Sequence, residues 1–213
     1  MPVFFQQQIN HTTRLAIWSI EETEEFFLSD VPLQKEVTHP HKRLQHLAAR
    51  FLLKYLFPDF PYELIETADT KKPFLTNEQY HFSISHCGDY AAAIVSSDKR
   101  VGIDIELPTL KVARVAHKFL NEEERKTFSI QYSIFNSQQS SEEVLSVLTQ
   151  LWSAKEAVFK WYGLGGVDFR EHIQLTAKNE NKGLIKCDFK KTKEQLSVNV
   201  HHVGELVLAW VVN

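Results

Sequence analysis

Helix-type and strand-type patterns occupy separate stretches of this 213-residue chain, and that segregation limits the folds it can adopt. Residues 40–55 repeat apolar side chains at helical spacing, whereas residues 80–106 alternate or run apolar as strands do. A later helical stretch, ending at Gly163, is again followed by strand patterns. Segregated helices and hairpins favour an α+β fold over a doubly wound parallel sheet. The repeated order predicts two similar halves that meet near residue 100.

Several predicted helices carry local start or stop signals. Pro40 suits the first helical position, and the pair Asn121 and Glu124 has the pattern of a capping box. A third helix is expected from about residue 141 to residue 162, because Gly163 suits the position that follows a helix. We expect strands at residues 80–86, 90–95, 101–106, 183–189, 196–201 and 206–212, the last three as an antiparallel meander.

Composition excludes several classes of protein. Lys and Arg number 24 against 27 Asp and Glu, a net charge of −3, so no overall positive field exists to bind a nucleic acid. Two cysteines, Cys87 and Cys187, are too few for a disulfide framework and favour a reducing cytoplasm. No apolar stretch approaches the ~20 residues of a membrane span, and residues 1–10 lack the pattern of a secretory signal. We therefore expect a cytoplasmic protein that acts away from membranes.

The segment VGIDIE, residues 101–106, places two carboxylates on a predicted strand. Side chains alternate along a strand, so Asp104 and Glu106 share one face and Ile103 and Ile105 the other, with ~7 Å between side chains on a face. Paired carboxylates of this kind suit a hard cation such as Mg²⁺ or Mn²⁺. The alternative is an edge strand whose polar face meets water.

The segment WSAKEAVFKWYG, residues 152–163, is expected to be helical. Trp152, Glu156 and Lys160 then lie four residues apart on one face. Glu156 could complete the carboxylate set, with Lys160 facing an anion. The alternative is an ordinary surface pair worth roughly 0.2–0.5 kcal/mol, with Trp152 and Trp161 in the core.

The segment FSISHCG, residues 82–88, ends a predicted strand at a turn that contains glycine, a usual place for ligand contacts. His86 could donate a hydrogen bond to a phosphate, although a surface histidine is the simpler interpretation. A nucleophile pair of Ser85 and His86 is disfavoured, because neighbouring strand residues face opposite sides.

Basic side chains gather on the helix predicted to start at Pro40. Arg43, Arg50 and Lys54 share one face, and no acidic residue occurs between residues 37 and 58. This predicts a local positive surface suited to a compact, multiply charged ligand. The alternative is a solvated helix face.

Taken in order, FSISHCG, VGIDIE and WSAKEAVFKWYG resemble the three motifs of the 4'-phosphopantetheinyl transferases. The length of 213 residues is similar to the larger, monomeric Sfp-type group. Members of the family transfer the 4'-phosphopantetheine group of coenzyme A to a serine of an apo acyl or peptidyl carrier protein and release adenosine 3',5'-bisphosphate. The resemblance implies this activity and these partners, coenzyme A and a carrier protein, for the present chain.

The resemblance also implies roles for the residues of the predicted site. Asp104, Glu106 and Glu156 would bind Mg²⁺, with Mn²⁺ as a possible substitute. Glu156 would also act as general base toward the carrier serine, Lys160 would stabilise charge on the phosphate, and His86 would contact phosphate. These implied roles assign catalysis to Glu156, Lys160 and His86.

Further residues would bind coenzyme A by resemblance. Ser85 would donate beside His86, and Lys160 would hold a phosphate. Lys72 resembles the lysine of the family's Gly-Lys-Pro element, although Lys71 replaces the glycine here. Either Arg43 or Arg50 would contact the 3'-phosphate, since both registers give a sensible helix.

The family fold consists of two similar halves related by a pseudo-twofold, each a small, mostly antiparallel sheet packed on a long helix. Residues 1–100 would form the N-terminal half, with the contacts to coenzyme A. Residues 101–213 would form the C-terminal half, with the metal-binding carboxylates and the catalytic helix. A carrier protein would dock on the helix after residue 106 and on residues 129–141.

Two other functions use the same residues. A Mg²⁺-dependent diphosphate hydrolase would cleave coenzyme A without a protein acceptor. A catalytically silent module would bind coenzyme A or a carrier protein without reacting. The presence of Asp104, Glu106, Glu156 and Lys160 together favours an enzyme over the silent module.

Overall fold

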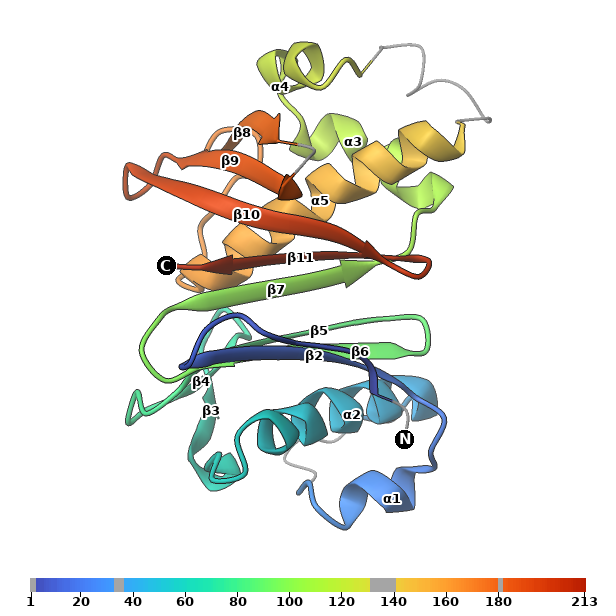
Figure 1. Cartoon of the computed structure of the whole chain (residues 1–213), viewed down its shortest axis with the longest axis vertical. Coiled ribbons are helices and arrows are strands. Elements are labelled where there is room, and N and C mark those ends of the chain that lie inside the picture. Colours follow the sequence, from blue (N-terminus) through green and yellow to red (C-terminus); the bar gives the residue numbers. More distant parts are fainter. Residues whose placement is uncertain (1–2, 33–36, 131–140, 180–181) are drawn as a thin grey trace. The chain divides into compact units, whose positions relative to one another are not determined.

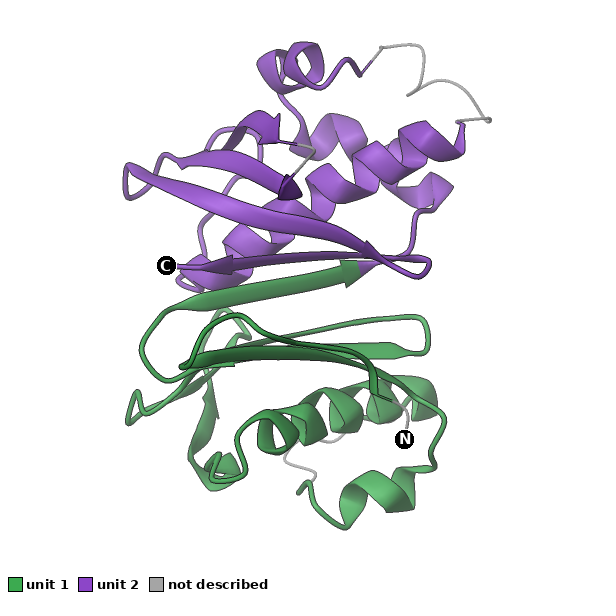
Figure 2. Ribbon diagram, viewed as in Figure 1, with its two compact units in different colours: residues 1–105 green, residues 106–213 purple. Residues whose placement is uncertain are grey.

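The computed structural model describes residues 3–32, 37–130, 141–179 and 182–213 (Figure 1). Within this described part the chain divides into two units, Met1–Ile105 (unit 1) and Glu106–Asn213 (unit 2), drawn in separate colours in Figure 2. Each unit combines antiparallel strands with a long helix, so the predicted α+β class is confirmed. The roles assigned to the two halves stay predictions.

Unit 1 is built on a sheet in the order β1-β2-β6-β5, with every neighbouring pair antiparallel. Its elements are β1 (Val3–Gln8), β2 (Thr13–Ser19), α1 (Glu24–Leu28), α2 (Pro40–Leu56), the 3-10 turn η1 (Tyr62–Leu64), β3 (Ile65–Thr67), β4 (Pro73–Leu75), β5 (His81–Cys87) and β6 (Tyr90–Ser96). The strands β5 and β6 and the helix start at Pro40 confirm the predictions from sequence. β7 (Val101–Glu106) then leads into unit 2.

α2 packs its apolar face on the sheet of unit 1, through side chains such as Leu47 and Leu52, both 0% exposed. The prediction that Arg50 shares an exposed face with Arg43 and Lys54 is wrong, because Arg50 is only 7% exposed. The chain that follows α2 folds back over this face, and the Tyr62 hydroxyl donates to the carbonyl of Arg50 at 2.6 Å. The spacing of residues within α2 could not predict this burial, because the residue that covers Arg50 lies outside the helix.

Unit 2 places α5 (Glu142–Tyr162) against an antiparallel run of strands in the order β11-β10-β9-β8. The strands are β8 (Ile173–Asn179), β9 (Leu184–Phe189), β10 (Glu194–Val203) and β11 (Leu206–Val212), which confirms the predicted meander and adds β8 to it. α3 (Leu110–Phe119) and α4 (Glu122–Thr127) precede α5. Most of the segment 129–141, expected to help dock a carrier, lies outside the described residues.

The predicted helix signals of unit 2 are confirmed. The Asn121 side chain accepts from the backbone of Glu124 while the Glu124 side chain accepts from the backbone of Asn121, a complete capping box. α5 ends at Gly163, whose φ of 71° lies in the left-handed region that glycine adopts without strain.

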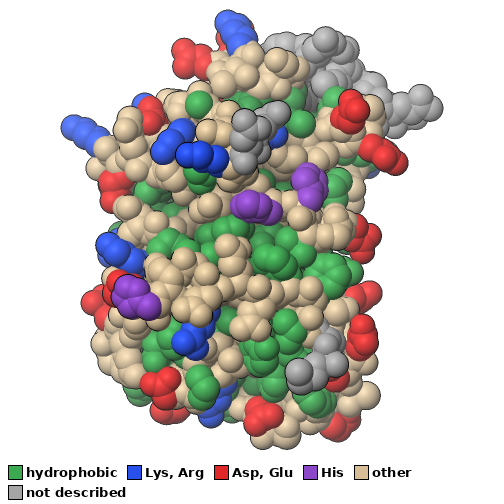
Figure 3. All heavy atoms as spheres, viewed as in Figure 1, with side chains coloured by type: hydrophobic (Ala, Val, Ile, Leu, Met, Phe, Trp, Pro, Cys, Tyr) green, Lys and Arg blue, Asp and Glu red, His purple; other side chains and the backbone are tan. Residues whose placement is uncertain are grey.

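The surface carries charge of both signs. Figure 3 displays one face of the molecule, on which Lys and Arg side chains stand among Asp and Glu rather than in one large patch. No helix in the described part of the chain is long and apolar enough to cross a membrane.

Candidate active site

Asp104, on β7, is a buried carboxylate held from β5. Its exposed fraction is 3%, and its Oδ1 accepts a hydrogen bond of 2.9 Å from the hydroxyl of Ser85. The same hydroxyl accepts from the backbone N–H of Ile105, at 3.3 Å. Asp104 therefore does not sit on a polar face that meets water. Ser85 and Asp104, predicted for one site, are brought into direct contact.

His86 follows Ser85 but faces the other side of β5 and is exposed, as strand alternation requires. The turn after it contains Gly88, with a φ of 53°, and joins α2 through a 2.7 Å hydrogen bond from the Gln45 side chain to the Gly88 carbonyl. This turn, adjacent to His86, is thus fixed to the helix that carries the predicted arginines.

Glu106 and Trp152 meet within unit 2. The indole N–H of Trp152 donates to Oε1 of Glu106 at 3.4 Å. The Trp152 ring packs against Phe119 and Phe169, with ring centroids 5.0 and 5.5 Å apart. Trp152 thus packs against the core of unit 2, as its interpretation as a core residue expected, and it also makes a polar contact that the sequence did not predict.

Glu156 and Lys160 lie one and two turns after Trp152 on α5, and all three side chains are half-buried. Lys160 falls in the last turn, where the helix dipole favours a cation. Between them lie buried side chains such as Ala157 and Val158, which face the core. α5 thus presents the acid and the cation outward while its other face packs.

The two candidate arginines have different surroundings. Arg43 is paired with Glu24 of α1, through its Nε at 2.9 Å and its Nη2 at 2.7 Å. Arg50 has its Nη1 3.0 Å from Nδ1 of His46, and burial lowers the pKa of Arg50 to about 10. The predicted acid-free positive surface is therefore wrong for Arg43, because the fold brings Glu24 to it from a distant part of the sequence.

Lys72 lies in the β3–β4 connection. Burial, and then the positive charge of Arg100, lower the pKa of Lys72 to about 8. Lys71, which stands where the family element has glycine, adopts a φ of 66° in the left-handed region. The turn that glycine would make is thus present, with a lysine under local strain. His81 also has a lowered pKa, mainly through burial, with Arg100 and Lys72 contributing.

The carboxylates predicted to bind a metal divide between the units, with Asp104 in unit 1 and Glu106 and Glu156 in unit 2. Within the described residues, no three His, Cys, Asp or Glu side chains form a group that could hold a metal ion. The chemistry of the three predicted donors, all carboxylate oxygens, nevertheless fits Mg²⁺ or Mn²⁺ rather than a thiophilic metal.

Neither Cys87 nor Cys187, both among the described residues, forms a disulfide. Cys187 is buried in unit 2, and this burial raises its pKa to about 12, so it is inert. Cys87 is half-buried beside the exposed His86.

The family model of the 4'-phosphopantetheinyl transferase superfamily matches residues 100–211, which is more than half of the chain. The chain therefore belongs to this superfamily. The matched range contains β7, α5 and the whole meander, and with them Asp104, Glu106, Glu156 and Lys160.

Individual relatives carry related names. An L-aminoadipate-semialdehyde dehydrogenase-phosphopantetheinyl transferase of Xenopus laevis is 27% identical over 130 residues, covering 56% of this chain and 43% of that protein. A Haemophilus influenzae protein, named as an unconfirmed 4'-phosphopantetheinyl transferase, is 31% identical over 60% of this chain and 52% of its own length. The 4'-phosphopantetheinyl transferase AcpT of Escherichia coli K12 is 26% identical over 73% of this chain and 80% of AcpT. The chain thus spans about half the length of the first two relatives.

Proposed function

We propose that this protein transfers the 4'-phosphopantetheine group of coenzyme A to a serine of an apo acyl or peptidyl carrier protein, with Mg²⁺ or Mn²⁺, releasing adenosine 3',5'-bisphosphate. The observation that carries the proposal is the superfamily match over residues 100–211, which includes the complete set Asp104, Glu106, Glu156 and Lys160. The proposal describes a monomeric, cytoplasmic enzyme that needs neither nucleic acid nor a membrane.

The reaction is a direct displacement at phosphorus. The carrier serine Oγ bonds to the phosphorus next to pantetheine, and the P–O bond to adenosine 3',5'-bisphosphate breaks. Glu156 takes the serine proton, and Lys160 stabilises negative charge as it develops on the phosphate. Asp104, Glu106 and Glu156 would hold the cation, which when bound neutralises the diphosphate and orients the leaving oxygen.

The buried hydrogen bond between Ser85 and Asp104 supports this assignment, because it fixes the carboxylate before any ligand arrives. His86, exposed at the end of β5, is accessible to a phosphate of coenzyme A. Lys72 and one of the two arginines would bind the nucleotide end.

Intact-protein mass spectrometry tests the proposal. Apo carrier proteins of the fatty-acid and the peptidyl type are incubated separately with the full chain, coenzyme A and Mg²⁺, with EDTA as the control. The expected result is a gain of one phosphopantetheine that EDTA abolishes. Hydrolysed coenzyme A with an unchanged carrier would instead identify the diphosphate hydrolase, and intact coenzyme A bound without reaction would identify the silent module.

A further inference from the structure

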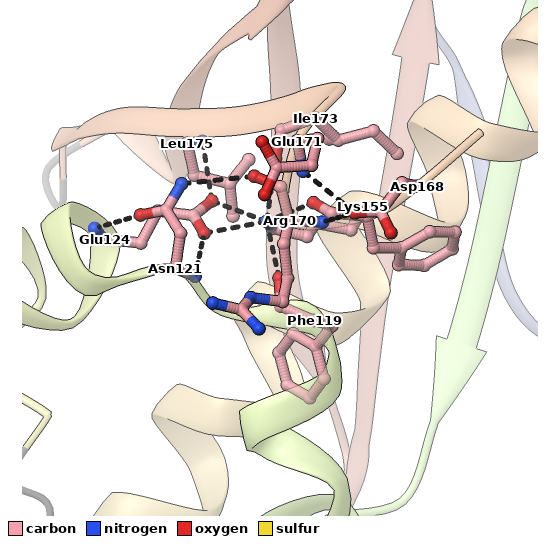
Figure 4. A network of polar contacts seen from close by, with 10 residues as sticks. Phe119, Asn121, Glu124, Lys155, Asp168, Arg170, Glu171, Ile173 and Leu175 are labelled. Atoms are coloured by element: carbon pink, nitrogen blue, oxygen red, sulfur yellow. Dashed lines mark hydrogen bonds and ion pairs between the residues drawn. The ribbon is translucent and has the colours of Figure 1, made fainter.

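Lys155 is a cation with no exposed surface in the middle of α5. Its Nζ lies 2.8 Å from Oε2 of Glu124 and donates to the carbonyls of Phe119, Phe169 and Ile173, each at 2.7 Å. Figure 4 shows this amine enclosed by acceptors. An ammonium group has three donors, so its hydrogen-bonding capacity is used entirely inside unit 2.

Glu124 connects the same amine to two more elements. Its Oε2 accepts from the backbone N–H of Asn121 at 2.9 Å, and its Oε1 accepts from that of Leu175, also at 2.9 Å (Figure 4). The start of α4 and the strand β8 are therefore tied to α5 through one carboxylate. A fully satisfied buried network of this kind fixes one arrangement of the elements it joins.

Two of the carbonyls bound by Lys155 belong to residues that hold Trp152. The backbone of Phe119 and of Phe169 accepts from Lys155, while their rings pack on Trp152 at centroid distances of 5.0 and 5.5 Å. Trp152 in turn donates to Glu106 at 3.4 Å. A continuous path of contacts thus runs from the buried amine to a predicted metal ligand.

We propose that Lys155 is a positioning residue for the transfer reaction: by holding Phe119 and Phe169 it fixes Trp152, which orients Glu106. The inference rests on the proposed function for the role of Glu106. Lys155 itself touches neither substrate nor metal. If Lys155 only stabilised unit 2, its loss would lower stability and leave the rate per folded molecule unchanged.

The test compares Lys155→Met, the double variant Lys155→Met with Glu124→Met, and the control Val198→Ala. Loss of Lys155 alone leaves the Glu124 carboxylate buried without its cation. The double variant removes both charges, so it can be measured in place of the single variant if the single variant fails to fold. Val198, on β10, is 0% exposed, so the control weakens the core of the same unit without removing a hydrogen bond of the Lys155 network.

The first readout is the indole N–H signal of Trp152 in the ¹⁵N-labelled full chain, which has four tryptophans, assigned with Trp152→Phe. We expect this signal to shift in both Lys155 variants and not in Val198→Ala. The second readout is steady-state transfer to a carrier. We expect kcat to fall about tenfold or more in both Lys155 variants, with little change in the KM for coenzyme A.

An unshifted Trp152 signal in the Lys155 variants would overturn the proposal, and so would a kcat equal to that of Val198→Ala. If the unaltered protein modifies no carrier, the proposed function fails. The Trp152 signal would then still decide whether Lys155 positions Trp152.

Discussion

The long helix of each unit carries one buried cationic side chain. The two cations differ in whether a carboxylate pairs with them. Lys155 on α5 meets a carboxylate and three carbonyls inside unit 2. The guanidinium of Arg50 on α2 contacts His46 and is influenced by Tyr62, and among the residues that the structure describes no carboxylate pairs with it. Burial lowers the pKa of Arg50 to about 10, and the nearby Tyr62 offsets this lowering only in part.

The difference teaches what each cation is suited to do. A buried charge that is fully paired stabilises its surroundings, whereas one without an opposite charge costs free energy until an anion binds. Lys155 therefore belongs to the internal framework. Arg50 has no carboxylate partner among the described residues, whereas Arg43 already has Glu24, so we expect Arg50 rather than Arg43 to contact the 3'-phosphate of coenzyme A.

The largest expected effect is on stability. Lys155→Met should lower the free energy of unfolding by about 3–5 kcal/mol, because it leaves the Glu124 carboxylate buried and unpaired. Arg50→Met should cost at most about 1 kcal/mol, because it removes an uncompensated buried charge. Urea unfolding followed by circular dichroism measures both. Equal losses of unfolding free energy in the two variants would contradict the difference between a paired and an unpaired buried cation.

Affinity for coenzyme A should show the reverse order. Arg50→Met should weaken binding roughly 10–100-fold, the range of a hydrogen bond between charged groups. Arg43→Met, the matched control on the same helix, should weaken binding less than about threefold, since the guanidinium of Arg43 is already paired with Glu24. Isothermal titration calorimetry measures both. A larger effect of Arg43→Met would assign the phosphate contact to Arg43.

Binding should also depend on pH through Lys72, whose pKa is lowered to about 8. A bound phosphate favours the charged amine, so binding above pH 8 must take up a proton. We expect affinity to be constant below this pH and to fall above it, by up to about tenfold per pH unit. Lys72→Met should abolish this loss of affinity above pH 8. The control Lys71→Met changes the exposed neighbouring lysine and should retain it. A pH-independent affinity in the unaltered protein would contradict the role of Lys72.

The smallest effect is expected at Lys71, whose φ of 66° is strained for a residue with a side chain. Lys71→Gly should raise the free energy of unfolding by about 0.5 kcal/mol, because relief of strain exceeds the entropy lost with glycine. The affinity for coenzyme A should not change. A destabilised variant would show that Lys71 makes a favourable contact in this turn.

Local signals predicted the elements that carry the site. Pro40 marked the start of α2, the Asn121–Glu124 capping box marked α4, and Gly163 marked the end of α5. The alternation of VGIDIE predicted β7 with Asp104 and Glu106 on one face. These features depend on neighbours within about one helical turn or one strand, which a single sequence contains in full.

The rest depends on distant contacts. Lys155 lies 31 residues from Glu124, and its other acceptors are backbone carbonyls, which leave no side-chain pattern. Arg50 is buried by the chain around Tyr62, and Arg43 is paired with Glu24 of α1. β1 and β2 lacked a clear alternation, so the pairing of β2 with β6 and of β1 with β2 was not predicted.

The central claim is that the carboxylates of β7 and α5 perform the transfer, and Asp104→Asn tests it most directly. The substitution keeps the shape of the side chain and an oxygen for the Ser85 hydroxyl while removing the charge. Transfer to an apo carrier protein is followed by intact-protein mass spectrometry beside the unaltered chain. The account predicts transfer by the unaltered protein and a loss of about a hundredfold or more in the variant, with an unchanged circular dichroism spectrum. Transfer by Asp104→Asn at the unaltered rate would contradict it.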